Sequence, residues 1–352
     1  MIHNIPQELV DAVVCEVAAD GDKPTRLSAL TACSLTSWSF FSPARKGLFG
    51  QITLIEDAGD DTDLSVKARS KLEELLQLIE DDPCRSYPNQ TTLPKHIKSL
   101  IIQFSSLRTL QKMHNTSPGN QKQSLLPVLL DLIPNARELN LSFGSNEAHN
   151  AWPYIDDSLK EKLVHFCTSR PIHKMQFGHI DRLPLTLITS CPKLKALSMH
   201  FTKLDPDNHP QASEPLSVLS YLCIAGAPLV LDISNPTTRY LQLGAFKRLE
   251  ILELKWNFGS VVDGISGLLP WIDLKRGRGH STSIAIPIHT LIIVAEWTSY
   301  RSRREHRHFI PSAGWRSLDD ILSTDSSPKI LDKEYSEKAS KITTFVVSVG
   351  KS

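Results

Sequence analysis

A short apolar pattern of the form L-x-x-L-x-L returns seven times between residues 97 and 293, and this recurrence limits the possible folds more than any other feature of the chain. In each copy a single residue separates the last two apolar residues, as the alternation of a strand requires. The central residues of the copies are Leu100, Leu139, Met175, Leu197, Leu222, Leu252 and Leu291. Weaker copies contain Leu241 and Val347. The recurrence predicts a solenoid.

The repeating units differ in length. The spacing between successive central residues ranges from 22 to 39 residues, whereas regular leucine-rich repeats contain about 20 to 29 residues, so several units carry insertions. One insertion, residues 125–133, is apolar on nearly all sides. Another has a helical stripe formed by Ile155, Leu159, Leu163 and either Phe166 or Cys167. Because a helix returns the chain, the next strand lies parallel to the last, and we expect parallel strands lined by helices.

Prolines mark where these helices are expected to end. Pro134, Pro171 and Pro192 each come shortly before a strand pattern, which predicts the repeating order helix, proline, strand. Upstream, residues 66–82 carry a helical stripe that ends at Pro83. We expect this helix to lie against the first repeats and to fix their angle to the amino-terminal segment.

The first fifty residues predict three short helices. The first begins near Ile5, with Pro6 in its opening turn, where a missing N–H costs nothing. Thr25 is the expected N-cap of the second helix. The third is expected to open at Ser42, with Pro43 as its first residue.

These helices carry more apolar surface than they can cover among themselves, because a domain of about 50 residues buries too small a fraction of its area. The surface must therefore meet a partner. That partner is either another protein or the rest of the same chain, and the residue pattern alone leaves both possibilities open. Val14 and Leu30 are expected to be internal.

Two motifs in this segment carry a family resemblance. The first, Ile5-Pro6-Gln7-Glu8-Leu9, is similar to an L-P-x-E-L opening. The second, residues 33–49, reads CSLTSWSFFSPARKGLF and is similar, without a gap, to the C-S-L-V-C-R-S-W-x-P-x-(S/A)-R-(R/K)-x-L-F stretch of fungal F-box proteins. Two departures are Ile5, in place of the opening Leu, and Phe40, which stands where the family usually has Trp and lacks an indole N–H.

The resemblance implies an α/β chain with a three-helix F-box over residues 1–50, a helical linker over 51–92 and an irregular leucine-rich-repeat-like solenoid with a parallel sheet over 93–352. It further implies the substrate-recognition subunit of an SCF-type ubiquitin ligase, which docks on a Skp-family adaptor and, through it, on cullin and RING subunits. The adaptor-binding residues that it implies are Ile5, Pro6, Leu9, Val13, Leu35, Phe40 and Pro43.

The repeat array would then hold a protein substrate, whose identity the sequence does not reveal. Candidate contacts lie between the apolar strand positions and are Gln103, Asn140, Gln176, Ser198 and Glu253. Two alternatives stay open. The amino-terminal helices of a repeat scaffold can merely cap the solenoid, and an F-box protein can work with the adaptor outside any ligase.

Composition argues against several other classes of protein. The formal net charge of +1 lacks the electrostatic footprint of a dedicated nucleic-acid binder. No stretch approaches the roughly 20 apolar residues of a membrane span, and the amino terminus lacks the features of a secretory signal. The six cysteines form no C-x-x-C pair and no group with histidines, so we expect free thiols without a metal. The expected location is cytoplasmic, nuclear or both.

No P-loop, Rossmann fingerprint, H-E-x-x-H or G-x-S-x-G motif is present, so the sequence predicts a non-catalytic protein without a cofactor. The basic run Arg301 to His308 is interpreted as a solvated loop. Its alternatives are a nuclear-import or nucleic-acid patch and, together with Lys275, Arg276 and Arg278, a cationic rim for an acidic substrate.

Overall fold

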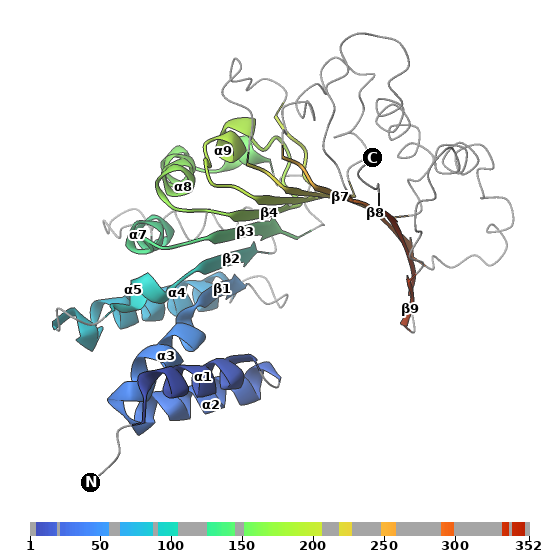
Figure 1. Ribbon diagram of the computed structural model, residues 1–352. Coiled ribbons are helices and arrows are strands. Elements are labelled where there is room, and N and C mark those ends of the chain that lie inside the picture. The colour runs from blue at the N-terminus through green and yellow to red at the C-terminus, as the bar shows by residue number, and fades with distance from the viewer. Residues whose placement is uncertain are drawn as a thin grey trace, which may run out of the picture. The chain divides into compact units, whose positions relative to one another are not determined.

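The structure is a computed structural model of the 352-residue chain. It describes residues 5–19, 22–55, 64–86, 91–104, 125–144, 151–205, 218–226, 248–257, 290–298, 333–337 and 340–348. The chain forms two compact units (Figure 1). The first contains residues 1–149 and 155–172, and the second contains residues 150–154 and 173–352. Leu241 and the run Arg301 to His308 lie outside the described residues.

The first unit begins with three helices, which we call the helical module and which are blue in Figure 1: α1 (Gln7–Ala19), α2 (Lys23–Thr36) and α3 (Trp38–Phe49). Their small core contains Val14, Leu30 and Ala44, all at most 2% exposed, with Val17, Ala18, Cys33, Phe40 and Leu48 packed around it. The predicted burial of Val14 and Leu30 is therefore confirmed.

Two of the predicted helix starts are wrong. Helix α2 begins at Lys23, with Asp22 as the N-cap residue, and the Thr25 hydroxyl donates to the Asp22 carboxylate over 2.6 Å. Helix α3 begins at Trp38, so Pro43 lies inside it instead of opening it. An interior proline leaves the carbonyl four residues earlier without its helical donor.

The rest of the first unit contains three strands and the elements that cover them (Figure 1). The strands β1 (Gln51–Ile55), β2 (Ser99–Phe104) and β3 (Glu138–Phe143) pair in parallel in that order. The other elements are α4 (Leu64–Glu80), the 3-10 turn η1 (Pro83–Ser86), α5 (Leu93–His96), α7 (Leu125–Leu132) and α8 (Asp157–Ser169). Strand β1 was not predicted, because its five residues lack the repeat pattern. In the structure only Leu54 of these residues is buried.

The helices pack through the stripes that the sequence predicts. Helix α4 contacts β1 and α7, and α7 contacts α8, so the expected placement of α4 against the first repeats is confirmed. The buried residues of α8 are Leu159, Leu163, Phe166 and Cys167. At the surface, Lys162 pairs with the Asp131 carboxylate over 2.6 Å, and the Arg170 guanidinium donates to the Asp131 carbonyl over 3.0 Å.

The second unit contains a seven-strand ladder in the order β4-β5-β6-β7-β8-β10-β9. The strands are β4 (Lys174–Gly178), β5 (Ala196–His200), β6 (Tyr221–Ala225), β7 (Ile251–Asn257), β8 (Thr290–Thr298), β9 (Lys333–Glu337) and β10 (Ser340–Ser348). The unit also contains η2 (Trp152–Tyr154) and α9 (Leu185–Thr189). Strands β4 to β8 are parallel, as predicted.

The copy that contains Val347 departs from the parallel pattern. Strand β10 is antiparallel to both β8 and β9. Only two residues separate β9 from β10, and so short a connection joins antiparallel strands. The last strand pair is therefore a hairpin instead of a helix-returned repeat.

The apolar repeat positions form the core, as predicted. The repeat residues that are buried on the strands are Leu100, Ile102, Leu139, Leu141, Met175, Phe177, Leu197, Met199, Leu222, Ile224 and Leu252. Pro134, Pro171 and Pro192 each stand between a helix that has ended and the next strand, so the order helix, proline, strand is confirmed for β3, β4 and β5. The side chain of Leu291 lies outside the description.

Left-handed residues follow three successive strands of the second unit. His179 after β4, Phe201 after β5 and Gly226 after β6 have φ angles of 55°, 48° and 70°. The His179 and Phe201 rings stack with centroids 4.8 Å apart. A Cβ at position 226 would lie 2.2 Å from the Phe201 ring, so this position requires glycine on both conformational and steric grounds.

Candidate functional site

The helical module exposes large apolar side chains. Leu9 and Val13 are 57% and 51% exposed, and their spacing of four residues places them on one side of α1, while Ile5, two residues before the helix, is 62% exposed. At the junction of α2 and α3, Leu35 is 81% and Trp38 63% exposed. We call these five residues the apolar surface of the helical module. Monomeric proteins rarely expose such groups of large apolar side chains outside interaction sites.

A hydrogen bond joins the two parts of this surface. The Gln7 side chain at the start of α1 donates to the Ser39 carbonyl in the first turn of α3 over 3.0 Å. This carbonyl is the one that Pro43, four residues later, cannot engage. The start of α1, with Leu9, is therefore held next to the start of α3, with Trp38.

The predicted adaptor residues fall into two groups in the structure. Ile5, Pro6, Leu9, Val13 and Leu35 are exposed, whereas Phe40 and Pro43 are half-buried. Phe40 packs against the core of the helical module, so its side chain supports the fold in addition to any contact it makes.

Trp38 was not among the predicted adaptor residues. It packs edge to face on Phe41, with ring centroids 5.1 Å apart, and Phe41 in turn lies 4.9 Å below the guanidinium of Arg45. The sequence carried a signal for it, because Ser37 is a preferred N-cap residue that sets Trp38 at the start of a helix.

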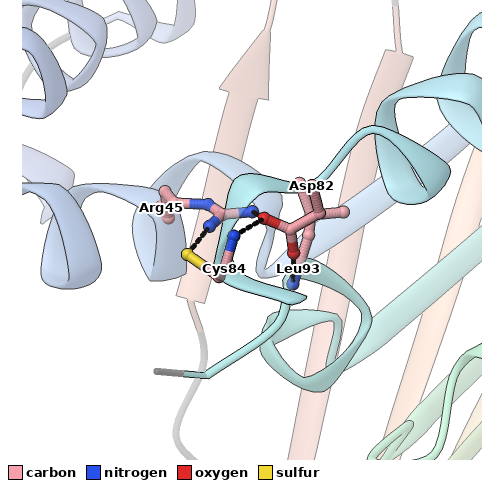
Figure 2. Close-up of polar contacts among 4 residues, drawn as sticks. All are labelled: Arg45, Asp82, Cys84 and Leu93. Atoms are coloured by element: carbon pink, nitrogen blue, oxygen red, sulfur yellow. Dashed lines mark hydrogen bonds and ion pairs between the residues drawn. The ribbon is translucent and has the colours of Figure 1, made fainter. Parts of the chain in front are cut away.

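A buried ion pair joins the helical module to the segment after α4 (Figure 2). Arg45 of α3 is 5% exposed, and its Nη2 lies 2.9 Å from Oδ1 of Asp82, whose side chain is fully enclosed. Arg45 Nη1 donates to the Cys84 sulfur over 2.8 Å. The Asp82 carboxylate also accepts from the backbone N–H of Cys84, over 3.1 Å, and of Leu93, over 2.5 Å. We call Arg45, Asp82, Cys84 and Leu93 the Arg45–Asp82 joint.

The protonation states of the joint follow from its contacts. Burial raises the pKa of Asp82, but hydrogen bonds from Leu93, Cys84 and Arg45 outweigh it and hold that pKa below its usual value. Burial raises the pKa of the Cys84 thiol, which makes it a poor nucleophile. Burial, and then the charge of Arg45, lowers the pKa of His96 at the end of α5. The joint is thus one charged pair beside a neutral thiol and a neutral imidazole.

The predicted substrate contacts lie on the strands, between buried apolar residues. In the second unit, Gln176, Ser198 and Glu253 fall on one register row across β4, β5 and β7, with the buried Cys223 of β6 between them. In the first unit, Asn140 is paired with Ile101, and Gln103 with Ser142. The structure therefore brings three of the five residues into one row.

Glu253 is the most strongly engaged of these residues. The Tyr221 hydroxyl donates to its carboxylate, and Lys255 Nζ lies 2.9 Å from its Oε1. Burial and the hydrogen bond to Glu253 raise the pKa of Tyr221, which stays a neutral donor. In the first unit, Asn140 Oδ1 is buried and has no hydrogen-bond partner within the described part of the chain.

Within the described ranges, no group of three or more His, Cys, Asp or Glu side chains is placed to hold a metal ion. No helix among the described elements has both the length and the apolar character needed to cross a bilayer. A comparison of this chain with protein-family models and with curated proteins finds no match.

Proposed function

We propose that this protein is the substrate receptor of an SCF-type ubiquitin ligase and works in the cytoplasm or nucleus. In this proposal the helical module is an F-box that docks on a Skp-family adaptor, and the strands belong to an irregular leucine-rich-repeat-like solenoid that holds a target protein. The observation that carries it is the exposure of the apolar surface of the helical module.

The energetics favour a protein partner for this surface. Burying one large apolar side chain contributes about 1.5–3 kcal/mol, so the five residues together can supply the core of a stable interface. Tryptophan is prominent among the residues that dominate binding energy, and Trp38 stands at the junction of α2 and α3. The hydrogen bond between Gln7 and Ser39 supports the proposal further, because it orders the surface before a partner arrives.

The strand residues support the receptor half of the proposal. Gln176, Ser198 and Glu253 present polar groups in one row in the second unit, and Asn140 lies between buried apolar residues on β3 of the first unit. Polar groups at fixed positions on a rigid sheet are suited to recognising another protein's backbone or side chains. We propose that these residues, together with Gln103, contact the substrate.

The proposed mechanism is proximity. The receptor contributes no chemistry of its own. It holds a lysine-bearing protein close to the charged conjugating enzyme, so that the transfer of ubiquitin becomes effectively intramolecular.

The test is adaptor binding by a variant of the apolar surface. Leu9→Asp places a charge in the proposed interface, and we expect it to abolish co-purification of a Skp-family adaptor, since a desolvated unpaired charge costs several kcal/mol. The matched control is Cys15→Asp, which introduces the same charge at an exposed position about 120° around α1 from Leu9 and should bind as the wild type does.

Two outcomes would overturn the proposal. If Leu9→Asp and the wild type capture the adaptor equally, the docking surface is wrong. If the wild type is stable and monomeric beside purified adaptor, the helical module only caps the solenoid. Capture of the adaptor without any cullin would instead indicate an F-box protein that works outside a ligase.

A further inference from the structure

Hydrogen bonds join the helical module to the rest of the first unit both at the chain connection and at the Arg45–Asp82 joint. At the chain connection only Gly50 separates α3 from β1, and its carbonyl accepts from the backbone N–H of Lys98, over 2.8 Å, and of Ser99, over 3.0 Å. The second place is the Arg45–Asp82 joint, where α3 meets the end of α4 and the start of α5 (Figure 2).

We propose that Arg45 and Asp82 are positioning residues for ubiquitin transfer. In this inference, which rests on the proposed function, they fix the direction in which the first strands of the repeat array, β1 to β3, leave the adaptor-bound helical module. They thereby determine which lysines come within reach of the conjugating enzyme, and they contribute nothing to adaptor affinity.

The geometry of the joint suits this role. The Asp82 carboxylate accepts from three donors that belong to different segments: Arg45 of α3, Cys84 of η1 and Leu93 of α5. Hydrogen bonds to a carboxylate have preferred directions, whereas apolar contacts tolerate sliding. Three bonds on one buried group therefore allow one mutual orientation of these segments and exclude neighbouring ones.

The burial of the joint supports the same inference. Arg45 and Asp82 are almost inaccessible to water, and replacing a buried ion pair by apolar residues of similar volume is often neutral or stabilising. Stability alone does not account for a charged pair at this place. Orientation does, because a buried ion pair gives a directional contact that an apolar pair lacks.

The joint is also separate from the proposed adaptor contacts. The apolar surface consists of Ile5, of residues in α1 and of residues at the junction of α2 and α3, whereas Asp82 lies outside the helical module. Arg45 stacks on Phe41, which packs against Trp38, so a change at Asp82 is the one that alters orientation while it leaves the adaptor surface in place. This separation makes the inference testable apart from the proposed function.

The test uses two joint variants and one control in the full chain. Asp82→Asn keeps the volume of the side chain but replaces one carboxylate oxygen by an N–H₂ group, which then faces a group that donated to Asp82. Arg45→Lys keeps the charge, but a lysine cannot reach Asp82 and Cys84 with two separate nitrogens. The control is Glu73→Gln, which breaks the exposed pair of Glu73 with Arg69 in α4.

The first measurement is independent of any ligase. Glu16 of α1 and Glu161 of α8 are both exposed and both belong to the first unit, and each is replaced by p-acetylphenylalanine carrying a keto-reactive spin label. Pulsed electron spin resonance should give one narrow distance distribution for the wild type and for Glu73→Gln. Both joint variants should give broad or multiple distributions. An unchanged distribution in two folded joint variants would overturn the inference.

The second measurement follows self-modification of the chain in a reconstituted ligase without added substrate. The joint variants should bind the adaptor as the wild type does, but modification of the lysines preferred by the wild type should fall about tenfold and spread to other lysines, because effective concentration depends on geometry. Equal rates on the same lysines would refute the positioning role. Absence of adaptor binding by the wild type would instead refute the proposed function, and with it the role in transfer, while the spin-label distances would still decide whether the joint fixes the orientation.

Discussion

The side-chain amide of Gln7 donates to the carbonyl oxygen of Ser39 across 3.0 Å. The same nitrogen lies 2.9 Å from the Asp11 carboxylate, so one amide group donates to an acceptor in α1 and to another in α3. The Ser39 carbonyl is free for this bond because Pro43 has no N–H to offer it. Because Pro43 interrupts the hydrogen bonding of α3, the Ser39 carbonyl can accept the bond that joins α1 to α3.

Replacing Gln7 should loosen this tie. We expect Gln7→Ala to lower the free energy of unfolding by about 1 kcal/mol, the usual net value of one hydrogen bond. Adaptor affinity should fall as well, since Leu9 and Trp38 would no longer be held together. Urea unfolding and calorimetric titration measure the two effects. Gln51→Ala removes a longer exposed contact of 3.3 Å with Thr53 and serves as the control, and equal losses in both variants would contradict the assignment.

Trp38 should be a dominant contact in adaptor binding. Trp38→Ala is expected to weaken binding by about 2 kcal/mol, or some thirtyfold, as truncation of a central aromatic contact does. The stability of the chain should change little, because the side chain is 63% exposed. The control is Tyr154→Ala in the second unit, an aromatic residue that is 58% exposed. A Trp38 variant with wild-type affinity would move the interface elsewhere on the module.

Acidification should destabilise the first unit in two steps. The pKa of His96 is lowered in the folded chain, so its contribution to stability is present above the unfolded value, about 6.5, and is lost as the pH falls through the folded value. The pKa of Asp82 is also lowered, so its contribution is lost only in more acidic solution, from below about 3.9.

Urea unfolding followed between pH 7 and pH 5 measures the first step. The free energy of unfolding should fall over this range in the wild type and fall less in His96→Gln. His179, whose pKa burial also lowers, contributes with the same sign in the second unit, so the comparison requires a probe within the first unit. An identical pH profile in His96→Gln would show that His96 is not responsible.

Gly226 should be intolerant of any side chain. Gly226→Ala forces a Cβ to within 2.2 Å of the Phe201 ring at a φ of +70°, and we expect a loss of about 1–3 kcal/mol. Phe201→Ala removes the clash but not the backbone strain. The double variant should therefore recover part of the loss, and a double-mutant cycle from urea unfolding measures the coupling. Strictly additive losses would show that the ring and the glycine do not interact.

The elements that were predictable are those with a long periodic pattern. Helices α7 and α8 and the strands from β2 to β8 carry repeated apolar residues, and those described from β2 to β7 form the core. Strand β1 and helix α9 have five residues each, which is too short for a period to stand out. The start of α3 was misplaced because a proline is favoured at the first helical position. In this protein Pro43 lies inside the helix, and the hydrogen bond from Gln7 satisfies the Ser39 carbonyl that the proline leaves without a donor.

The residues of the candidate site likewise divide into those that a sequence pattern predicts and those that only the structure shows. The stripe of α1 contains Leu9, Val10, Val13 and Val14. Val14 was expected inside, and the resemblance assigned Leu9 and Val13 to the adaptor, whereas the burial of Val10 is shown only by the structure. The exposed Leu35 followed from the motif and not from periodicity. The Arg45–Asp82 joint connects residues 37 positions apart, and no local pattern predicts a pairing over that distance.

The single residue between α3 and β1 also limits how this chain can be cut and recombined. Since the Gly50 carbonyl bonds to Lys98 and Ser99, a fragment ending near residue 50 would lose two backbone partners along with its exit strand. The helical module therefore cannot be transferred to another protein on its own. Chimeras that graft them onto an unrelated receptor need to carry at least β1, α4, α5 and β2 with them.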